Sequence, residues 1–160
     1  MTKEILLVLC LLLVALTFMG CTNGASNGID KLNLPKLTLE YTVDGETQKT
    51  TAAVNSLFWE VGNTLWQTDV EHPLRVIELL PVIERSDGVT ELKLSFSRDP
   101  NSFSVERWPD EYAALENFPS AEPVSVSGKT LVLSEEDKGY VYEVRVGWPQ
   151  GTVWYVFYVK

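Results

Sequence analysis

His72 is the only histidine in the chain and the first residue to consider for catalysis. An imidazole is the usual acid–base group near neutral pH, and Ser-His-Asp or Cys-His catalysis would depend on this one residue. No nucleophile-elbow pattern surrounds it. Its neighbours Asp69 and Glu71 leave two readings open, a metal site and a surface histidine before the turn at Pro73. We predict no catalytic residue, no metal ligand and no cofactor.

Acidic residues are plentiful but scattered, with the densest run at Glu135-Glu136-Asp137. That run lacks the alternating oxygen ligands of a calcium loop, so the sequence favours a solvated turn. A glycosidase needs two carboxylates held at a fixed separation, and no spacing in this chain singles out such a pair. No glycine-rich phosphate loop and no Cys/His metal pattern occurs.

The five tryptophans are the most notable feature of the composition. Trp59, Trp108 and Trp148 lie in apolar, strand-like stretches and are predicted to be core residues. Trp66 lies in the polar, loop-like stretch 62–68, and Trp154 alternates with Tyr155 on the last strand. Exposed aromatic rings stack on sugars or anchor protein partners. Trp66 and Trp154 are therefore the candidate binding residues.

Cys21 follows a leader in which Lys3 precedes an apolar run over residues 5–16. Twelve helical residues span roughly 18 Å, short of a hydrocarbon core of about 30 Å, so the run is typical of a signal peptide. The sequence Phe-Met-Gly-Cys at 18–21 resembles the lipobox of bacterial lipoproteins, although Phe18 and Met19 are bulkier than usual. The resemblance implies that residues 1–20 are removed and that Cys21 carries the lipid. The alternative is an ordinary secretory leader ending near a cysteine.

Beyond the leader, the sequence predicts a flexible tether over residues 21–33 and a folded body over residues 34–160. The chain has 13 Lys and Arg against 22 Asp and Glu, a formal charge of −9. This charge excludes nucleic acid as a partner and excludes polybasic attraction to anionic lipid. With Cys10 removed in the leader and Cys21 acylated, no thiol remains for a disulfide.

Alternating apolar and polar residues recur along the body. They predict strands over 37–43, 57–61, 92–96, 103–108, 140–148 and 152–159. The last of these is apolar on both faces and is expected to be covered on both sides. Residues 124–127 and 129–133 flank Gly128, which indicates a bend or a hairpin there. Asp44-Gly45 predicts a hairpin turn, and only short helical turns fit residues 72–84 and 110–118. About seven strands without long helices predict an all-β antiparallel sandwich.

The segment from Gly139 to Gly151, followed by the aromatic residues 154–157, resembles the closing hairpin of small uncharacterised lipoproteins of Gram-positive bacteria. Trp59, His72-Pro73-Leu74, Leu80-Pro81, residues 92–96 and Trp108 recur in such proteins in similar order. The resemblance implies an immunoglobulin-like sandwich and carries no activity. Residues 137–142 are similar to the immunoglobulin corner before strand F, with the Tyr one residue late and Val144 in place of the Cys.

These features together predict a lipid-anchored binding module on the extracytoplasmic face of the cell membrane, without catalytic activity. Its partner would be a protein or a glycan of the cell envelope. The alternative function is a cell-wall carbohydrate-binding protein that uses exposed aromatic residues. A surface with aromatic rings along a groove would favour glycan, and a flat apolar patch would favour protein.

Overall fold

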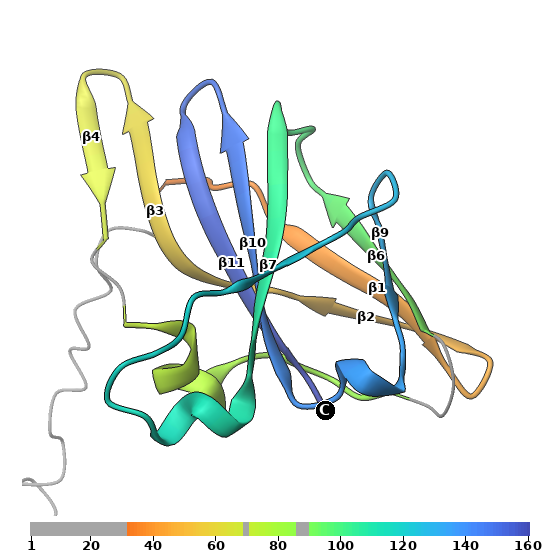
Figure 1. The fold of residues 1–160 in the computed structure, drawn as a ribbon. Helices are drawn as coiled ribbons and strands as arrows, with labels where there is room; N and C mark the ends of the chain where they lie inside the picture. Colours follow the sequence, from red (N-terminus) through yellow and green to blue (C-terminus); the bar gives the residue numbers. More distant parts are fainter. Residues whose placement is uncertain (1–31, 69–70, 86–89) are drawn as a thin grey trace, which may run out of the picture. The chain divides into compact units, whose positions relative to one another are not determined.

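Eleven β-strands and three short 3₁₀ helices make up the described part of the chain (Figure 1). The structure, a computed structural model, describes residues 32–68, 71–85 and 90–160, and residues Leu34–Lys160 form one unit. The predicted leader, its Cys21 and most of the tether lie outside the described residues. The strands are β1 (Leu37–Val43), β2 (Glu46–Thr51), β3 (Ala53–Val61), β4 (Thr64–Gln67), β5 (Val82–Ile83), β6 (Thr90–Phe96), β7 (Ser102–Pro109), β8 (Glu122–Val124), β9 (Thr130–Leu133), β10 (Tyr140–Trp148) and β11 (Gly151–Val159). The helices are η2 (Pro73–Leu79), η3 (Asp110–Ala114) and η4 (Glu135–Asp137).

The strands form two sheets, and the predicted all-β antiparallel sandwich is confirmed. The smaller sheet has the order β2-β1-β6-β9, and the larger has the order β4-β3-β11-β10-β7-β8. Short β5 pairs in parallel with β11, and every other pairing is antiparallel. The described strands outnumber the seven expected because β2 is polar throughout, and β4, β5 and β8 are too short for an alternating pattern to show.

The order of the strands follows that of an immunoglobulin sandwich. In that fold, strands A, B and E are neighbours in one sheet and strands C, F and G in the other. Here β1, β6 and β9 of the smaller sheet correspond to strands A, B and E, and β7, β10 and β11 of the larger sheet correspond to strands C, F and G. Strands β2 to β5 are inserted between β1 and β6. Of these, β2 joins the smaller sheet beside β1, whereas β3, β4 and β5 join the larger sheet at β11.

The core lies between the two sheets, on the faces predicted by alternation. On β10, Tyr142, Val144, Val146 and Trp148 are buried on one face, as expected. Phe96 of β6 and Phe103 of β7 meet across the sandwich with ring centroids 5.4 Å apart. The predicted core positions of Trp59 and Trp148 are confirmed, and their rings meet edge to face at 5.7 Å.

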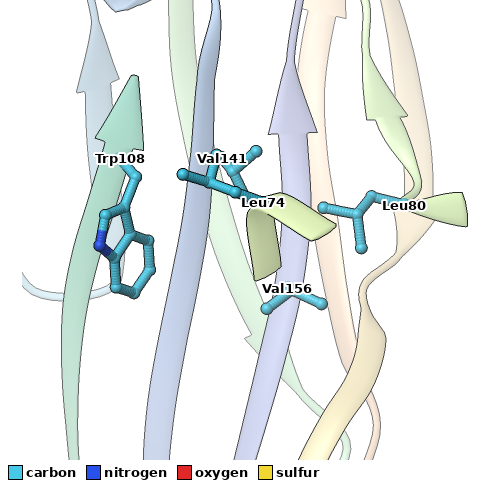
Figure 2. Packing of buried hydrophobic residues seen from close by; sticks show 5 residues of the cluster. All are labelled: Leu74, Leu80, Trp108, Val141 and Val156. Carbon is cyan, nitrogen blue, oxygen red and sulfur yellow. The ribbon is translucent and has the colours of Figure 1, made fainter. Parts of the chain in front are cut away.

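A second apolar cluster lies on the outer face of the larger sheet. Figure 2 shows Trp108 of β7, Val141 of β10 and Val156 of β11 side by side, with Leu74 and Leu80 packed over them from η2 and the residue after it. Trp108 is thus buried as predicted, but outside the sandwich core. The cluster covers β11 on its outer face at Val156 and Tyr158, so the expected cover on both faces holds for the C-terminal half of the strand, whereas Thr152 and Trp154 are only half-buried.

The helices are short, as the prolines predict. His72 caps η2, since its Nδ1 accepts a hydrogen bond from the Leu74 amide at 3.3 Å, and Pro73 occupies the first helical position. Helix η3 ends at Ala114. Within the described ranges, no helix is long and apolar enough to cross a bilayer.

The turn at residues 135–137 is solvated at Glu135 and Glu136, as the sequence favoured, but not at Asp137. Asp137 accepts hydrogen bonds from Ser134 and from the Tyr142 hydroxyl, and it pairs with Arg107 of β7. Only 13% of its side chain is exposed. Burial alone would raise the pKa of Asp137, but the Ser134 hydrogen bonds and the Arg107 charge outweigh it and hold the pKa below its ordinary value. The Tyr142 contact gives the corner a tyrosine bonded back to the preceding turn.

Candidate binding face

The two candidate tryptophans lie on opposite faces of the larger sheet. Trp66 is directly opposite Trp59 in the pairing of β4 with β3, and residues opposite one another share a face. Because Trp59 points into the core, Trp66 lies at the rim of the core. Trp154 is opposite Ser56 of β3 and Arg145 of β10, on the outer face. The two rings therefore do not form one platform.

The loop predicted around Trp66 is wrong. Residues 64–67 form the edge strand β4, and the chain turns at Gly62, which has a positive φ of 60°. Trp66 itself is half-buried, whereas its neighbour Leu65 is 53% exposed on the outer face. Trp66 thus extends the core and does not lie on the exposed outer side of the β3–β4 hairpin.

Trp154 is half-buried, with the guanidinium of Arg145 lying 5.1 Å from the centroid of its ring. This distance is within the range of a cation–π contact. The row that crosses the sheet here has small residues at both ends, Ser56 on β3 and Ser104 on β7. Short neighbours leave the tryptophan and the arginine as the dominant side chains of the row.

The next row toward the β10–β11 turn adds a second aromatic ring. Phe58 of β3 is 46% exposed and is followed across the sheet by Thr152, Gly147 and Ser102. Phe58 and Trp154 lie on the same face of adjacent strands. Phe58 is directly opposite Thr152, and Trp154 is two residues further along β11, so the two rings are diagonal neighbours within reach of each other. We call these two rows the open face, defined by Ser56, Phe58, Ser102, Ser104, Arg145, Gly147, Thr152 and Trp154.

Packing against η2 and its neighbours separates the open face from the covered half of the sheet. The row through Tyr158, Val141 and Trp108 belongs to the covered cluster of Figure 2. Between it and the open face, Glu143 stands directly opposite Glu106, and Asn55 donates a 3.5 Å hydrogen bond to Glu143. The open face therefore has an aromatic end at Phe58 and a carboxylate border at Glu143 and Glu106.

Glu143 is the ionisable group on this face that is most perturbed. Burial raises the pKa of Glu143 to about 6, and repulsion from Glu106 acts in the same direction against the Asn55 hydrogen bond. Two carboxylates directly opposite each other on adjacent strands repel each other. Part of the negative charge at this border is thus lost in mildly acidic solution.

We expect Glu143→Gln to stabilise the protein at pH 7 by about 1–2 kcal/mol, since one pKa unit corresponds to about 1.4 kcal/mol. Because the pKa of Glu143 is higher in the folded state than in the unfolded state, the stability of the parent falls as pH rises from about 4.5 to about 6. Urea unfolding at pH 7 and at pH 4.5 measures the difference, which should shrink at the lower pH. Glu106→Gln is the control: Glu106 is the exposed member of the pair, so its substitution should stabilise the protein less. A Glu143→Gln variant less stable than the parent at pH 7 would contradict this account.

His72 is engaged in packing. Its ring stacks on Phe118 at 4.0 Å and meets Trp108 edge to face at 4.9 Å. Burial lowers the pKa of His72, and the positive charge of Arg75 acts in the same direction, so the neutral imidazole is favoured at neutral pH. Across the described residues, no three His, Cys, Asp or Glu side chains gather as metal ligands. Asp69, weighed as a ligand beside His72, lies outside the described residues.

Comparison with known proteins gives no relatives: no family model, no curated protein and no solved structure matches the chain. The site therefore has to be interpreted from its own geometry. Sequence reasoning missed Phe58 and Arg145 as candidate binding residues. The available signal was their alternation with buried neighbours, Leu57 and Trp59 for Phe58, and Val144 and Val146 for Arg145.

Proposed function

We propose that this protein is a non-catalytic binding module, anchored by lipid on Cys21 at the extracytoplasmic face of the cell membrane. The open face is its binding surface. The observation that carries the proposal is that one half of the outer face of the larger sheet is covered by η2, while the other half presents Phe58, Trp154 and Arg145. Aromatic residues and arginine are the types most enriched in binding surfaces.

The chemistry of the same region supports binding over catalysis. His72 uses its Nδ1 to cap η2 and its ring to pack on Trp108 and Phe118. An acid–base imidazole must reach substrate, whereas this half-buried ring is already engaged in capping and in aromatic packing. Glu143 and Glu106 lie directly opposite each other on adjacent strands, and Glu143 accepts the Asn55 hydrogen bond. The chain thus offers a surface to be covered by a partner.

The partner in the envelope could be a protein or a glycan. One observation supports the second candidate function, glycan binding. Phe58 and Trp154 share the open face with serine, threonine and glycine, and Arg145, Glu143 and Asn55 lie within two rows. Sugar rings combine apolar faces with many hydroxyls, so a site for them needs flat aromatic rings beside several donors and acceptors. Most of these positions are polar or small, a composition less apolar than the core of a protein–protein interface.

The test is binding of the body, residues 29–160, to cell-envelope material. We expect Phe58→Ala combined with Trp154→Ala to reduce co-sedimentation with purified cell-wall glycan at least tenfold, because each half-buried ring contributes on the order of 1 kcal/mol or more. Val132→Ala, at an exposed position on β9 of the smaller sheet, is the matched control and should bind like the parent. Capture of one envelope protein through the same two residues, without glycan binding, would favour the protein partner. Unchanged binding to both by the double variant would refute the open face.

The anchor has its own test. Cys21→Ser removes the only thiol at the lipobox-like site, so we expect the variant to leave the membrane fraction or to keep its leader. Fractionation followed by mass determination of the N-terminus distinguishes the two outcomes. A variant that is cleaved and still sediments with membranes would show that the lipid on Cys21 is not the anchor.

A further inference from the structure

A separate cavity of about 370 Å³ is lined by residues of η2, β5, η3 and the end of β11, away from the open face. Its apolar walls are Ile77 of η2, Val82 of β5 and Ala113 of η3. Its volume falls in the range of small-ligand sites, whose walls are mostly apolar with a few polar groups. No residue of the open face lines it.

The polar side of this cavity carries more negative than positive charge. Asp110, Glu78 and Tyr158 line it together with Lys160. The Tyr158 hydroxyl donates a 2.6 Å hydrogen bond to Oδ2 of Asp110, which fixes the carboxylate in the wall. The two acids outnumber the single lysine, and the whole chain is strongly acidic. The local charge therefore favours a cation over an anion.

Gly139 leaves room for this carboxylate because it has no side chain. Its φ of +76° suits glycine, and a Cβ at this position would lie 3.2 Å from Oδ1 of Asp110. The amide of Asp110 also donates a 2.7 Å hydrogen bond to the Gly139 carbonyl. Asp110 is thus held by its own backbone and by Tyr158. A fixed carboxylate beside apolar walls suits a group that is charged at one end and aliphatic along its length.

We infer that this cavity binds the alkylammonium group of an aliphatic amine, either a free amine or the side chain of a lysine on a partner. The ammonium group lies against Asp110 and Glu78, and the methylene chain lies along Ile77, Val82 and Ala113. The Lys160 ammonium is an internal competitor for the same carboxylates. The inference stands independently of the open face, since the two regions share no residue.

The experiment is isothermal titration of the full chain in detergent with n-butylamine, with butyrate as the anion of similar length and Nα-acetyl-lysine amide as the side-chain probe. We expect saturable millimolar binding of butylammonium and none of butyrate. Asp110→Asn should weaken binding about tenfold. Lys160→Met should strengthen it two- to fivefold, the size expected of an exposed charge contact.

Ala113→Leu fills the cavity without changing its charge, and it should abolish binding while leaving the circular dichroism spectrum unchanged. Binding of both amines assigns the site to a lysine side chain, and binding of butylamine alone assigns it to a free amine. Either result supports the inference. Butylamine binding that survives Ala113→Leu and Asp110→Asn, preferential binding of butyrate, or no binding of either amine would overturn it.

Discussion

Trp148→Ala is expected to lower the free energy of unfolding by about 3–5 kcal/mol, the usual loss when a buried tryptophan is truncated. The ring is 5% exposed, contacts Trp59 at 5.7 Å and Tyr155 at 6.4 Å, and donates from Nε1 to the Arg98 carbonyl at 3.2 Å. Truncation leaves a cavity and an unpaired carbonyl together. Urea unfolding at neutral pH measures the loss.

Trp154→Ala is the matched control, because it removes the same side chain from the half-buried outer face of the neighbouring strand. Its loss should be well below that of Trp148→Ala. If Trp148→Ala melts within a degree or two of the parent, the placement of Trp148 between the sheets is wrong.

Asp137→Ala should cost about 2–4 kcal/mol at pH 7, because it leaves the partly buried Arg107 with only the more exposed Glu122 as an ion partner. It also leaves Ser134 and Tyr142 without their acceptor. The exposed pair of Asp99 with Lys129 at 2.8 Å is the control, and Asp99→Ala should cost less than about 1 kcal/mol.

The pH dependence separates the charge of Asp137 from its packing. Because the folded-state pKa is lowered, the stabilisation is present above the unfolded value of about 3.9 and is lost as pH falls through the folded value. The difference in stability between the parent and Asp137→Asn should therefore begin to shrink as pH falls below about 4 and should close only below the folded-state pKa. A gap that stays constant from pH 7 to pH 3 would mean that the carboxylate charge contributes nothing.

The closing hairpin was the easiest part of the fold to predict from sequence. Residues 140–148 alternate in hydrophobicity because one face is buried, and Pro149-Gln150 leaves only a tight turn before Gly151. Gly151 is required there by a close approach, since a Cβ would lie 1.9 Å from the Phe58 carbonyl oxygen. The alternation and the turn chemistry are both local, so the sequence carries them.

The candidate site was harder to predict because it depends on contacts between distant segments. Trp66 lies among polar residues, and only its pairing with β3 makes that stretch a strand and turns the ring toward the core. Phe58 is exposed because η2 packs on the other half of the sheet, which no local pattern reveals. Asp137 likewise depends on Arg107, thirty residues earlier on β7. Local alternation assigns faces, but it does not tell which face stays uncovered.

The place of β11 has a consequence for how the chain reaches its folded state. This strand pairs with β3, β5 and β10, yet it follows all of them along the chain, and β3 precedes it by about 90 residues. Closing so long a loop is slow, and pairing between distant strands gives low folding rates. Until β11 arrives, β3 has only β4 beside it, and β5, which carries Ile83, pairs with no described strand. The chain therefore completes its sandwich only after synthesis has passed residue 159, and until then it depends on being kept from aggregation.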